Sequence, residues 1–431
     1  MVDRKGKALC PPHITKTTPR VEHMTQVLKF VLYSTTLGMF SEALTLSFGI
    51  GVQAFYLIIL LNLVLMLALK RLWMPTGLFL LIAVLAFSGA VGIIRGTDTP
   101  AHFLKEFAGI SISALFFCSF FRTMNFDLRK CFAIYARLAY WISIVGIFLY
   151  PIQYFVFHLY RLQSVLTEPA HFAAICLPAV YYFADRWFRF RTCGRETAVM
   201  LFAFLLSQSS VGIIGLFVGA SILIMRYRRA RLLFPAVLIV CGLSLHFISD
   251  DFARRLDDSV FSVQNTDVSG TNLSTFALFS NLFVMENVIN VHPLTGNGLG
   301  SHGISYQRYI GDLPGNNEFV EGGMGGLNAE DANSFLIRVL SDTGLLGTAL
   351  MFLFLWVYRP KGDTELSTIS KAVTVYFVVT LLRGGHYFSD ERFFFIILYA
   401  LCGIQNASER SLVGENLSLK PLGLQRVSSS G

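Results

Sequence analysis

Long uncharged apolar runs constrain this chain more than any other feature of its sequence. The run at 50–69 (IGVQAFYLIILLNLVLMLAL) carries no charge, and similar runs recur along most of the 431 residues. An α-helix needs about 20 such residues to cross the hydrocarbon core of a bilayer. Because 54% of the residues are apolar and 14% are charged, we expect an all-α integral membrane protein rather than two or three soluble domains.

The apolar runs predict twelve membrane-spanning helices. They lie near 29–48, 50–69, 73–94, 107–121, 131–157, 169–185, 197–207, 209–225, 232–248, 333–357, 366–382 and 393–405. One alternative concerns 197–225, which is either two short helices separated at SQSS (207–210) or a single long helix. A single helix would reverse the orientation of every later span.

The basic residues decide between these two topologies. With twelve spans and an N-terminus inside the cell, 25 of the 35 Lys and Arg residues lie on one side of the membrane. That excess is typical of cytoplasmic loops. A single helix over 197–225 would instead place the cluster RYRRAR (226–231) outside. We therefore expect both termini in the cytoplasm. The net charge of +8 then reflects short basic loops and indicates no nucleic-acid partner.

This topology leaves one long segment on the outer face of the membrane. The expected regions are a cytoplasmic N-terminal tail (1–28), spans one to nine (29–248), a large outer loop (249–332), which the family resemblance given below would place in the periplasm of a bacterial cell, spans ten to twelve (333–405) and a cytoplasmic tail (406–431). A loop of this length is usually functional. Within it, 272–290 is mostly apolar on one side of a helix, which predicts an interfacial helix lying over the membrane part.

Arginines on the expected outer side oppose the orientation rule, so each needs a reason. Arg161 precedes span six, and Arg338 lies one turn inside span ten. Arg254 and Arg255 open the outer loop, and Arg383 (LLRGGHYF) closes span eleven. For one such residue, ion pairing or snorkelling at a helix end is a sufficient explanation. Several together favour a site that holds a polyanionic headgroup.

Glu168, in the stretch TEPAHFA, has both a structural and a functional interpretation. Thr-Glu-Pro is a good helix start, with Pro169 in the first turn and an acid at the positive end of the helix dipole. That dipole and the neighbouring Arg161 favour the charged carboxylate. Glu168 therefore suits a group that orients or deprotonates an acceptor hydroxyl. His171, one turn further on, is expected to pack or to form a hydrogen bond.

The sequence predicts no cofactor and no metal. The glycine-rich stretch GNGLG (296–300) lacks a following Lys-Ser/Thr and any βαβ context, so it does not indicate a nucleotide-binding loop. His292, His302 and His386 do not have metal-ligand spacing with nearby Cys or acidic residues.

Four local patterns, in order, resemble a known family. They are TEPAHFA (167–173) after Arg161, SQSS followed by VGIIGL (207–216), SGT (269–271) followed by a helix and VHPLTGNGLGSHG (291–303), and NSFLIRVLSDTGLLGTALMFL (333–353) followed by RGGHYF (383–388). This arrangement resembles the O-antigen polymerase and ligase superfamily, and specifically Wzy-type polysaccharide polymerases. The resemblance covers roughly 161–400.

The resemblance implies a reaction at the outer face of the inner membrane. A growing glycan moves from undecaprenyl pyrophosphate to an incoming lipid-linked oligosaccharide, so both donor and acceptor are lipid-linked and no nucleotide sugar is used. Glu168 would act on the acceptor hydroxyl, and the outer arginines would grip the donor pyrophosphate. The expected substrate-binding residues are Arg161, Arg254, Arg255, His302, Asn333, Arg338, Arg383 and His386. The resemblance also makes a chain-length regulator and a flippase possible protein partners.

Two alternatives stay open. A ligase would pass the glycan to a lipid core, but ligases of this superfamily commonly carry a His-Asn pair where this chain has Asp331-Ala332-Asn333. A flippase or other transporter of lipid-linked glycans would not be an enzyme. Transporters tend to place charges at mid-membrane in several helices, whereas Arg137 is the main mid-span charge expected here.

Overall fold

The computed structural model describes residues 19–47, 51–225, 273–313 and 328–418, with the single residues 319, 322, 323 and 326. Nearly all of its regular elements are helices. In chain order they are α1 (Pro19–Gly38), β1 (Thr45–Ser47), β2 (Gly51–Gln53), α2 (Ala54–Ala68), α3 (Thr76–Arg95), α4 (Pro100–Thr123), α5 (Leu128–Phe155), α6 (Pro169–Phe190), α7 (Gly194–Ser207), α8 (Ser210–Ile224), α11 (Leu273–Val291), α12 (His302–Tyr309), η1 (Ile310–Asp312), α14 (Phe335–Val357), α15 (Glu365–Leu382) and α16 (Arg392–Ser418).

Five of the described helices, α3, α4, α5, α14 and α15, are long and apolar enough to cross a membrane. The helices α2 and α8 are also apolar but shorter. Large apolar side chains on α3 face outward, among them Phe87 (71% exposed) and Ile94 (84% exposed). Exposed apolar surface of this kind is unfavourable in water and suits contact with lipid. The chain therefore has the helices of a membrane protein, as its composition predicts.

The separation of 197–225 into two helices is confirmed. α7 ends at Ser207 and α8 begins at Ser210. Between them Gln208 adopts a left-handed conformation (φ 43°), which ends the first helix. The hydroxyl of Ser209 then accepts a hydrogen bond from the N–H of Gly212 and starts the second. The helix expected at 272–290 is also present, as α11.

The prediction that the first span continues to residue 48 is wrong. α1 ends at Gly38, and the chain then forms the antiparallel pair β1–β2. The mean hydropathy of 29–48 is high although the segment contains one acid, Glu42. The carboxylate of Glu42 forms a hydrogen bond with His171 on α6. Placing a charged group on a helix that faces lipid costs free energy, and a polar partner outside such a helix avoids that cost. The predicted span at 232–248 lies outside the described residues.

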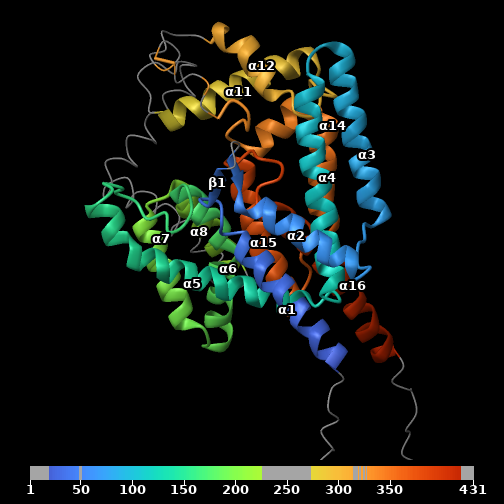
Figure 1. The fold of residues 1–431 in the computed structure, drawn as a ribbon, viewed down its shortest axis with the longest axis vertical. Coiled ribbons are helices and arrows are strands. Elements are labelled where there is room, and N and C mark those ends of the chain that lie inside the picture. Colours follow the sequence, from blue (N-terminus) through green and yellow to red (C-terminus); the bar gives the residue numbers. More distant parts are fainter. Residues whose placement is uncertain are drawn as a thin grey trace, which may run out of the picture.

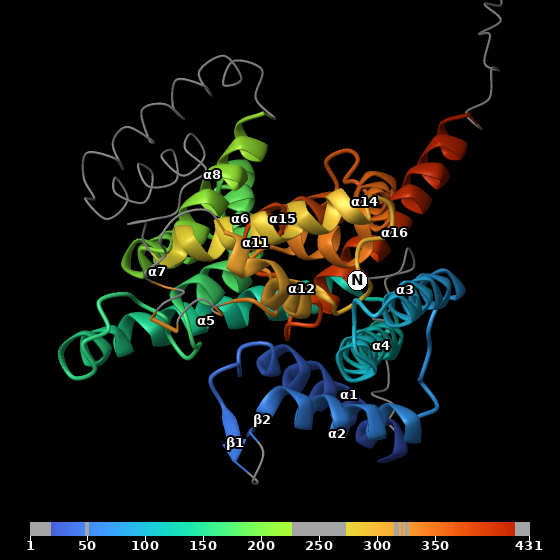
Figure 2. The same ribbon diagram turned by 90° about the horizontal axis from the view of Figure 1, so that it is seen from above.

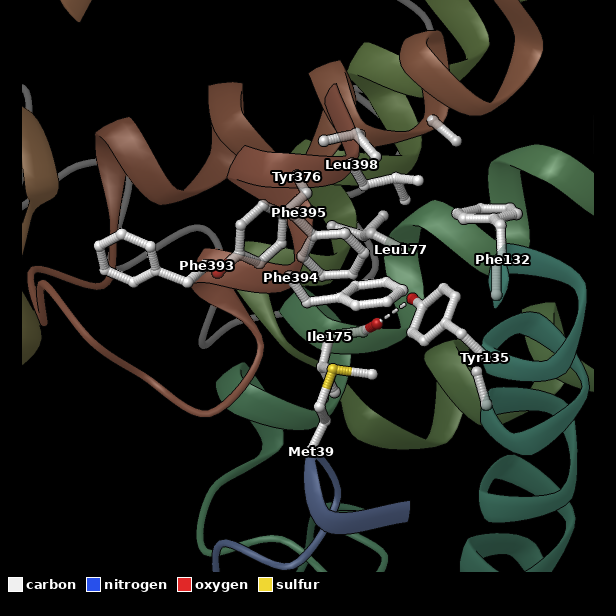
Figure 3. Packing of buried hydrophobic residues seen from close by; sticks show 14 of the residues in the cluster. Met39, Phe132, Tyr135, Ile175, Leu177, Tyr376, Phe393, Phe394, Phe395 and Leu398 are labelled. Carbon is white, nitrogen blue, oxygen red and sulfur yellow. Dashed lines mark hydrogen bonds between the residues drawn. The ribbon is translucent and has the colours of Figure 1, made fainter. Parts of the chain in front are cut away.

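The hydrophobic core lies where α5, α6, α15 and α16 pack together. Aromatic side chains fill it, and Figure 3 shows Phe394 and Phe395 of α16 beside Tyr135 of α5. The hydroxyl of Tyr135 is buried and donates a hydrogen bond to the carbonyl of Ile175 on α6 (Figure 3). A buried phenol needs such a partner, so this bond fixes α5 against α6.

The helices α11 and α12 lie at one end of the molecule, above α14 (Figure 1). The beginning of α1 and the end of α16 lie at the opposite end (Figure 1). Seen from above, α11 lies across the helices beneath it (Figure 2), and it packs on α14 and α12. Phe276, Val284 and Val288 are completely buried on its underside. We call α11 and α12 the cap.

Candidate functional site

The helix α14 is broken at Gly344, and a loop from the cap fills the break. Gly344 has the non-helical angles φ 63° and ψ −160°. The carbonyls of residues 341 and 342 accept hydrogen bonds of 2.9 Å from N–H groups in the loop 293–298. The N–H groups of residues 345 and 346 donate to carbonyls in the same loop. The polar backbone groups at the break are therefore satisfied inside the protein, as a broken helix at membrane depth requires.

Two glycines allow the loop 293–298 to approach α14 and α3 closely. Gly296 has φ 60°, and a Cβ there would lie 2.4 Å from the carbonyl oxygen of Ser341. On the other side of the loop, a Cβ on Gly298 would lie 2.7 Å from the Cα of Gly92 in α3. The loop is therefore clamped between α14 and α3. This packing gives the pattern GNGLG a structural explanation.

Asp342 fixes the loop from within α14. Its carboxylate is completely buried and accepts hydrogen bonds from the N–H groups of Gly300 and His302, each at 3.0 Å. The hydroxyl of Ser301 donates to it at 3.3 Å, and that of Tyr387 at 3.0 Å. One carboxylate thus joins α14, the start of the cap helix α12 and the connection between α15 and α16.

Arg338, one turn before Asp342, is only 3% exposed. Its guanidinium lies 2.9 Å from the carboxylate of Glu106 on α4 and 3.7 Å from that of Asp342. It also lies over the ring of Tyr387, 4.5 Å from the centroid, and donates to the carbonyl of Gly385 at 3.2 Å. Two buried acids therefore neutralise this arginine, and its contacts hold the chain that follows α15.

The stretch after α15, Arg383-Gly384-Gly385, forms a tight turn against the start of α14. Gly384 has φ 98°, and its N–H donates to the carbonyl of Asn333 at 3.0 Å. A Cβ on Gly385 would lie 1.4 Å from the carbonyl oxygen of Asp331. Only glycine permits this approach. We call 383–385 the RGG turn, and it brings residues about 50 positions apart in sequence into contact.

His386 and Asp331 form a pair directly beside the RGG turn. The Nε2 of His386 lies 3.3 Å from Oδ2 of Asp331, and the two side chains are 59% and 13% exposed. The other oxygen, Oδ1, accepts a hydrogen bond from the N–H of Asn333 at 3.1 Å. Desolvation lowers the pKa of His386, Asp331 opposes this, and the cations Arg338 and Arg392 add to the lowering.

A second carboxylate–histidine pair lies at the start of α6. The Nδ1 of His171 is 2.5 Å from Oε1 of Glu42, so the expectation that His171 forms a hydrogen bond is confirmed. Glu168 is exposed at the N-cap position of α6, and its side chain makes no capping hydrogen bond. Capping therefore does not account for Glu168.

The other residues predicted from the sequence differ in their surroundings. Arg161 is half-buried in the connection between α5 and α6, and Arg383 is half-buried at the end of α15. His302 is completely buried, and its ring Nε2 bonds with Oδ1 of Asn281 at 2.8 Å. Burial, with a smaller contribution from the charge of Arg338, lowers the pKa of His302 to about 3. Arg254 and Arg255 lie outside the described residues.

A small cavity opens on the buried ion pair. It has a volume of about 10 Å³, room for about one water molecule. An exposed ion pair, Lys105–Glu330, lies at its edge with 2.9 Å between charged atoms. The Lys105 ammonium lowers the pKa of Glu330. The lining residues are His102, Lys105, Glu106, Gly300, Gly303, Glu330 and Arg338.

Buried polar atoms without a hydrogen-bond partner gather around this cavity and the RGG turn. Within the described part of the chain they include Oε2 of Glu106, Nδ1 of His302, Nδ2 of Asn333, Oδ2 of Asp390 and both Nε and Nη1 of Arg392. Buried polar groups in proteins are nearly always bonded, to water or a ligand where protein offers nothing. These atoms are buried, so only a small polar molecule such as water that enters the interior could complete their hydrogen bonds.

Several of these residues were not singled out from the sequence. Glu106 lies just before the predicted span 107–121, Asp342 lies within the predicted span 333–357, and Glu42 lies in the run 29–48 that was predicted to be a span. One signal was available: Arg338 and Asp342 are four residues apart, which places their side chains on one face of a helix. No pattern in the sequence connects either residue to Glu106, because that contact joins two distant helices.

The chain matches no protein-family model and no curated protein. Among the described residues, no group of three or more His, Cys, Asp or Glu side chains is arranged to hold a metal ion. The candidate site is thus assigned from its geometry. It combines half-buried arginines, exposed carboxylates and imidazoles at one end of a helical membrane protein. Such groups can hold a phosphate-bearing substrate and accept a proton from it.

Proposed function

We propose that this protein is a polysaccharide polymerase. It joins oligosaccharide repeat units carried on undecaprenyl pyrophosphate into a long surface polysaccharide and releases the carrier pyrophosphate. The resemblance of 161–400 to Wzy-type polymerases suggests this reaction. In this proposal the protein crosses a bacterial inner membrane twelve times, with both termini in the cytoplasm and the cap in the periplasm.

One structural observation carries the proposal. The RGG turn contacts the segment 331–334, so that Asn333, Arg338, Arg383 and His386 come together from two distant parts of the chain. All four were selected from the sequence as substrate-binding residues. In this proposal Glu168, at the start of α6, acts on a substrate held at this place. A transfer reaction between two lipid-linked substrates needs such a meeting point at the membrane surface.

The residues divide into two groups by their surroundings. Arg161 and Arg383, with Arg254 and Arg255 of the outer loop, would hold the donor pyrophosphate and stabilise the charge that develops on it. Glu168 is exposed and makes no cap, so it can reach an acceptor hydroxyl. Asn333 is buried, and its backbone carbonyl holds the RGG turn through the N–H of Gly384, so it would support the site rather than touch the substrate.

Arg338 and His302 would act through other residues. Arg338 is already paired with two acids, and it holds the RGG turn through the carbonyl of Gly385. His302 ties α12 to α11 through Asn281. The cap would thereby be fixed over the place where the glycan is transferred, and its long loop would position the sugar chains.

The deciding experiment is deletion of the gene in the parent cell, followed by size analysis of the surface glycan. The polymerase proposal predicts products that carry a single repeat unit, and recovery of long chains when the gene is restored. Complete loss of surface glycan, with repeats accumulating on the cytoplasmic side, would instead identify a flippase. Unchanged chain lengths on carrier lipid, with none on the lipid core, would identify a ligase.

A further inference from the structure

We infer that His386 is the general base of the transfer reaction and that Asp331 holds its ring in position. This inference rests on the proposed polymerase function. It adds a residue that touches the reacting hydroxyl, and it assigns to Glu168 the separate task of orienting that hydroxyl. The first argument is the arrangement of the pair itself.

Asp331 is held in place by its own contacts. Its Oδ1 accepts the N–H of Asn333, which leaves Oδ2 for Nε2 of His386 at 3.3 Å. The two groups are in ion-pair contact rather than in an aligned hydrogen bond. A proton on Nε2 lies next to the carboxylate, which accepts, and the lone pair is then on Nδ1. A carboxylate beside one ring nitrogen and a basic second nitrogen are the components of an oriented base.

The exposed fractions of the two side chains fit these roles. The histidine is 59% exposed, so a substrate hydroxyl can reach Nδ1, whereas the aspartate is 13% exposed and shielded. Asp331 also cannot move away easily, because the RGG turn packs on its carbonyl through Gly385. Backbone contacts therefore fix the carboxylate against which the histidine ring lies.

The surrounding charges favour the neutral imidazole that a base requires. Apart from Asp331, the charges that act on His386 are those of Arg338, Arg392 and His171, and each disfavours a further positive charge. His171 is engaged by Glu42, so it is the less suitable of the two imidazoles to accept a proton. A neutral imidazole can receive a proton here while Arg161 and Arg383 hold the donor anion.

The step balances as follows. The acceptor hydroxyl gives its proton to Nδ1 of His386 as its oxygen forms a bond to the anomeric carbon of the donor glycan. The bond between that carbon and the pyrophosphate oxygen breaks, and its electron pair leaves on the pyrophosphate. The imidazolium then returns its proton to water. No oxidant, metal or nucleotide is consumed.

The test uses the full-length protein in lipid nanodiscs. The substrate is the lipid-linked glycan extracted from the deletion strain, which serves as both donor and acceptor. We expect His386→Gln to lower kcat by roughly 100- to 10,000-fold with little change in KM, as for loss of a general base.

Asp331→Asn should lower kcat less than His386→Gln does, and it should shift the pH profile of kcat. Added imidazole should partly restore His386→Ala. His158→Asn, at an exposed histidine between α5 and α6, is the matched control.

The outcomes separate the two proposals. A rate for His386→Gln within threefold of wild type, with Glu168→Gln inactive, would overturn the role of His386 and leave the polymerase proposal standing. A wild-type protein that never lengthens the lipid-linked glycan would overturn the polymerase proposal itself. If His386→Gln is unstable, the pH profile of Asp331→Asn decides, since a purely structural aspartate would not change that profile.

Discussion

Arg338 and Glu106 form an ion pair of 2.9 Å between α14 and α4, with side chains that are 3% and 8% exposed. A second pair, Lys105–Glu330, has the same length but lies at the surface, where its side chains are 59% and 71% exposed. The two pairs are close together and share the same small cavity. The two ion pairs therefore have the same length but differ in burial. Removing the acid should reduce the stability of the protein more for the buried pair than for the exposed pair.

We expect Glu106→Ala to destabilise the protein by about 1–3 kcal/mol, because it removes the closer acid and leaves a buried guanidinium N–H without its acceptor, while Asp342 still balances the charge. The matched change at the surface, Glu330→Ala, should cost at most about 1 kcal/mol. Chemical denaturation of both variants in detergent would measure the difference. Equal losses would show that the guanidinium of Arg338 is reached by water and is not buried as described.

Gly385→Ala should destabilise the RGG turn, because the added Cβ would meet the carbonyl oxygen of Asp331 at 1.4 Å. Overpacking of this kind typically costs about 1–3 kcal/mol. Gly77→Ala is the control, since a Cβ at that position in α3 meets nothing within 4 Å. Alanine is the better helix former, so Gly77→Ala should be neutral or slightly stabilising. The thermal unfolding midpoint should therefore fall for Gly385→Ala and stay the same or rise for Gly77→Ala. An unchanged midpoint for Gly385→Ala would contradict this packing.

Acid should weaken the cap through His302. Its pKa is about 3 in the folded protein and about 6.5 in an unfolded chain. Between these values the unfolded state binds the extra proton, so this contribution to stability is complete above pH of about 6.5 and declines as the pH falls toward 3. Comparing unfolding midpoints at several pH values, we expect His302→Gln to show a smaller decline than wild type. Parallel curves would mean that His302 does not contribute.

Glu168→Gln and Arg383→Ala should each remove long surface glycan while the protein still inserts and accumulates normally. Loss of the carboxylate removes the group that orients the acceptor, and loss of the guanidinium removes a cation that holds the donor pyrophosphate. Gel analysis of glycan from complemented deletion cells measures both effects. Arg308→Ala, at an exposed arginine of the cap, should keep chain lengths of wild type. Wild-type chains in both site variants would refute this assignment of the site.

Much of the helical structure could be predicted from hydropathy and local signals. The break at 207–210 and the helix α11 follow from such signals, because a polar tetrapeptide and an amphipathic pattern depend only on neighbouring residues. The error at 29–48 has the opposite cause. The helix ends early where the single acid Glu42 pairs with His171, a partner 129 positions away. An average over twenty residues cannot detect that contact.

The site could be predicted in part. Arg383, His386 and Asn333 were found because their charge or position was unusual for the expected topology. Asp342 was not found, because TGLLG after it resembles ordinary helix interior and hides the break at Gly344. The contact of Gly385 with Asp331 depends on the packing of two distant segments. Local sequence therefore predicted candidate residues, whose roles stay predictions, whereas the buried carboxylates beside them required the fold.

The break in α14 also has a consequence for biogenesis. A ribosome makes residues 293–298 before it makes 341–346, so the strip of loop that completes the broken helix already exists when α14 emerges. The backbone N–H and C=O groups at the break can therefore form their hydrogen bonds with the loop as soon as the second half of α14 is made. A circularly rearranged chain that placed the cap after α14 would lose this order of synthesis. Such a chain should be degraded more often during insertion, even though its finished contacts would be the same.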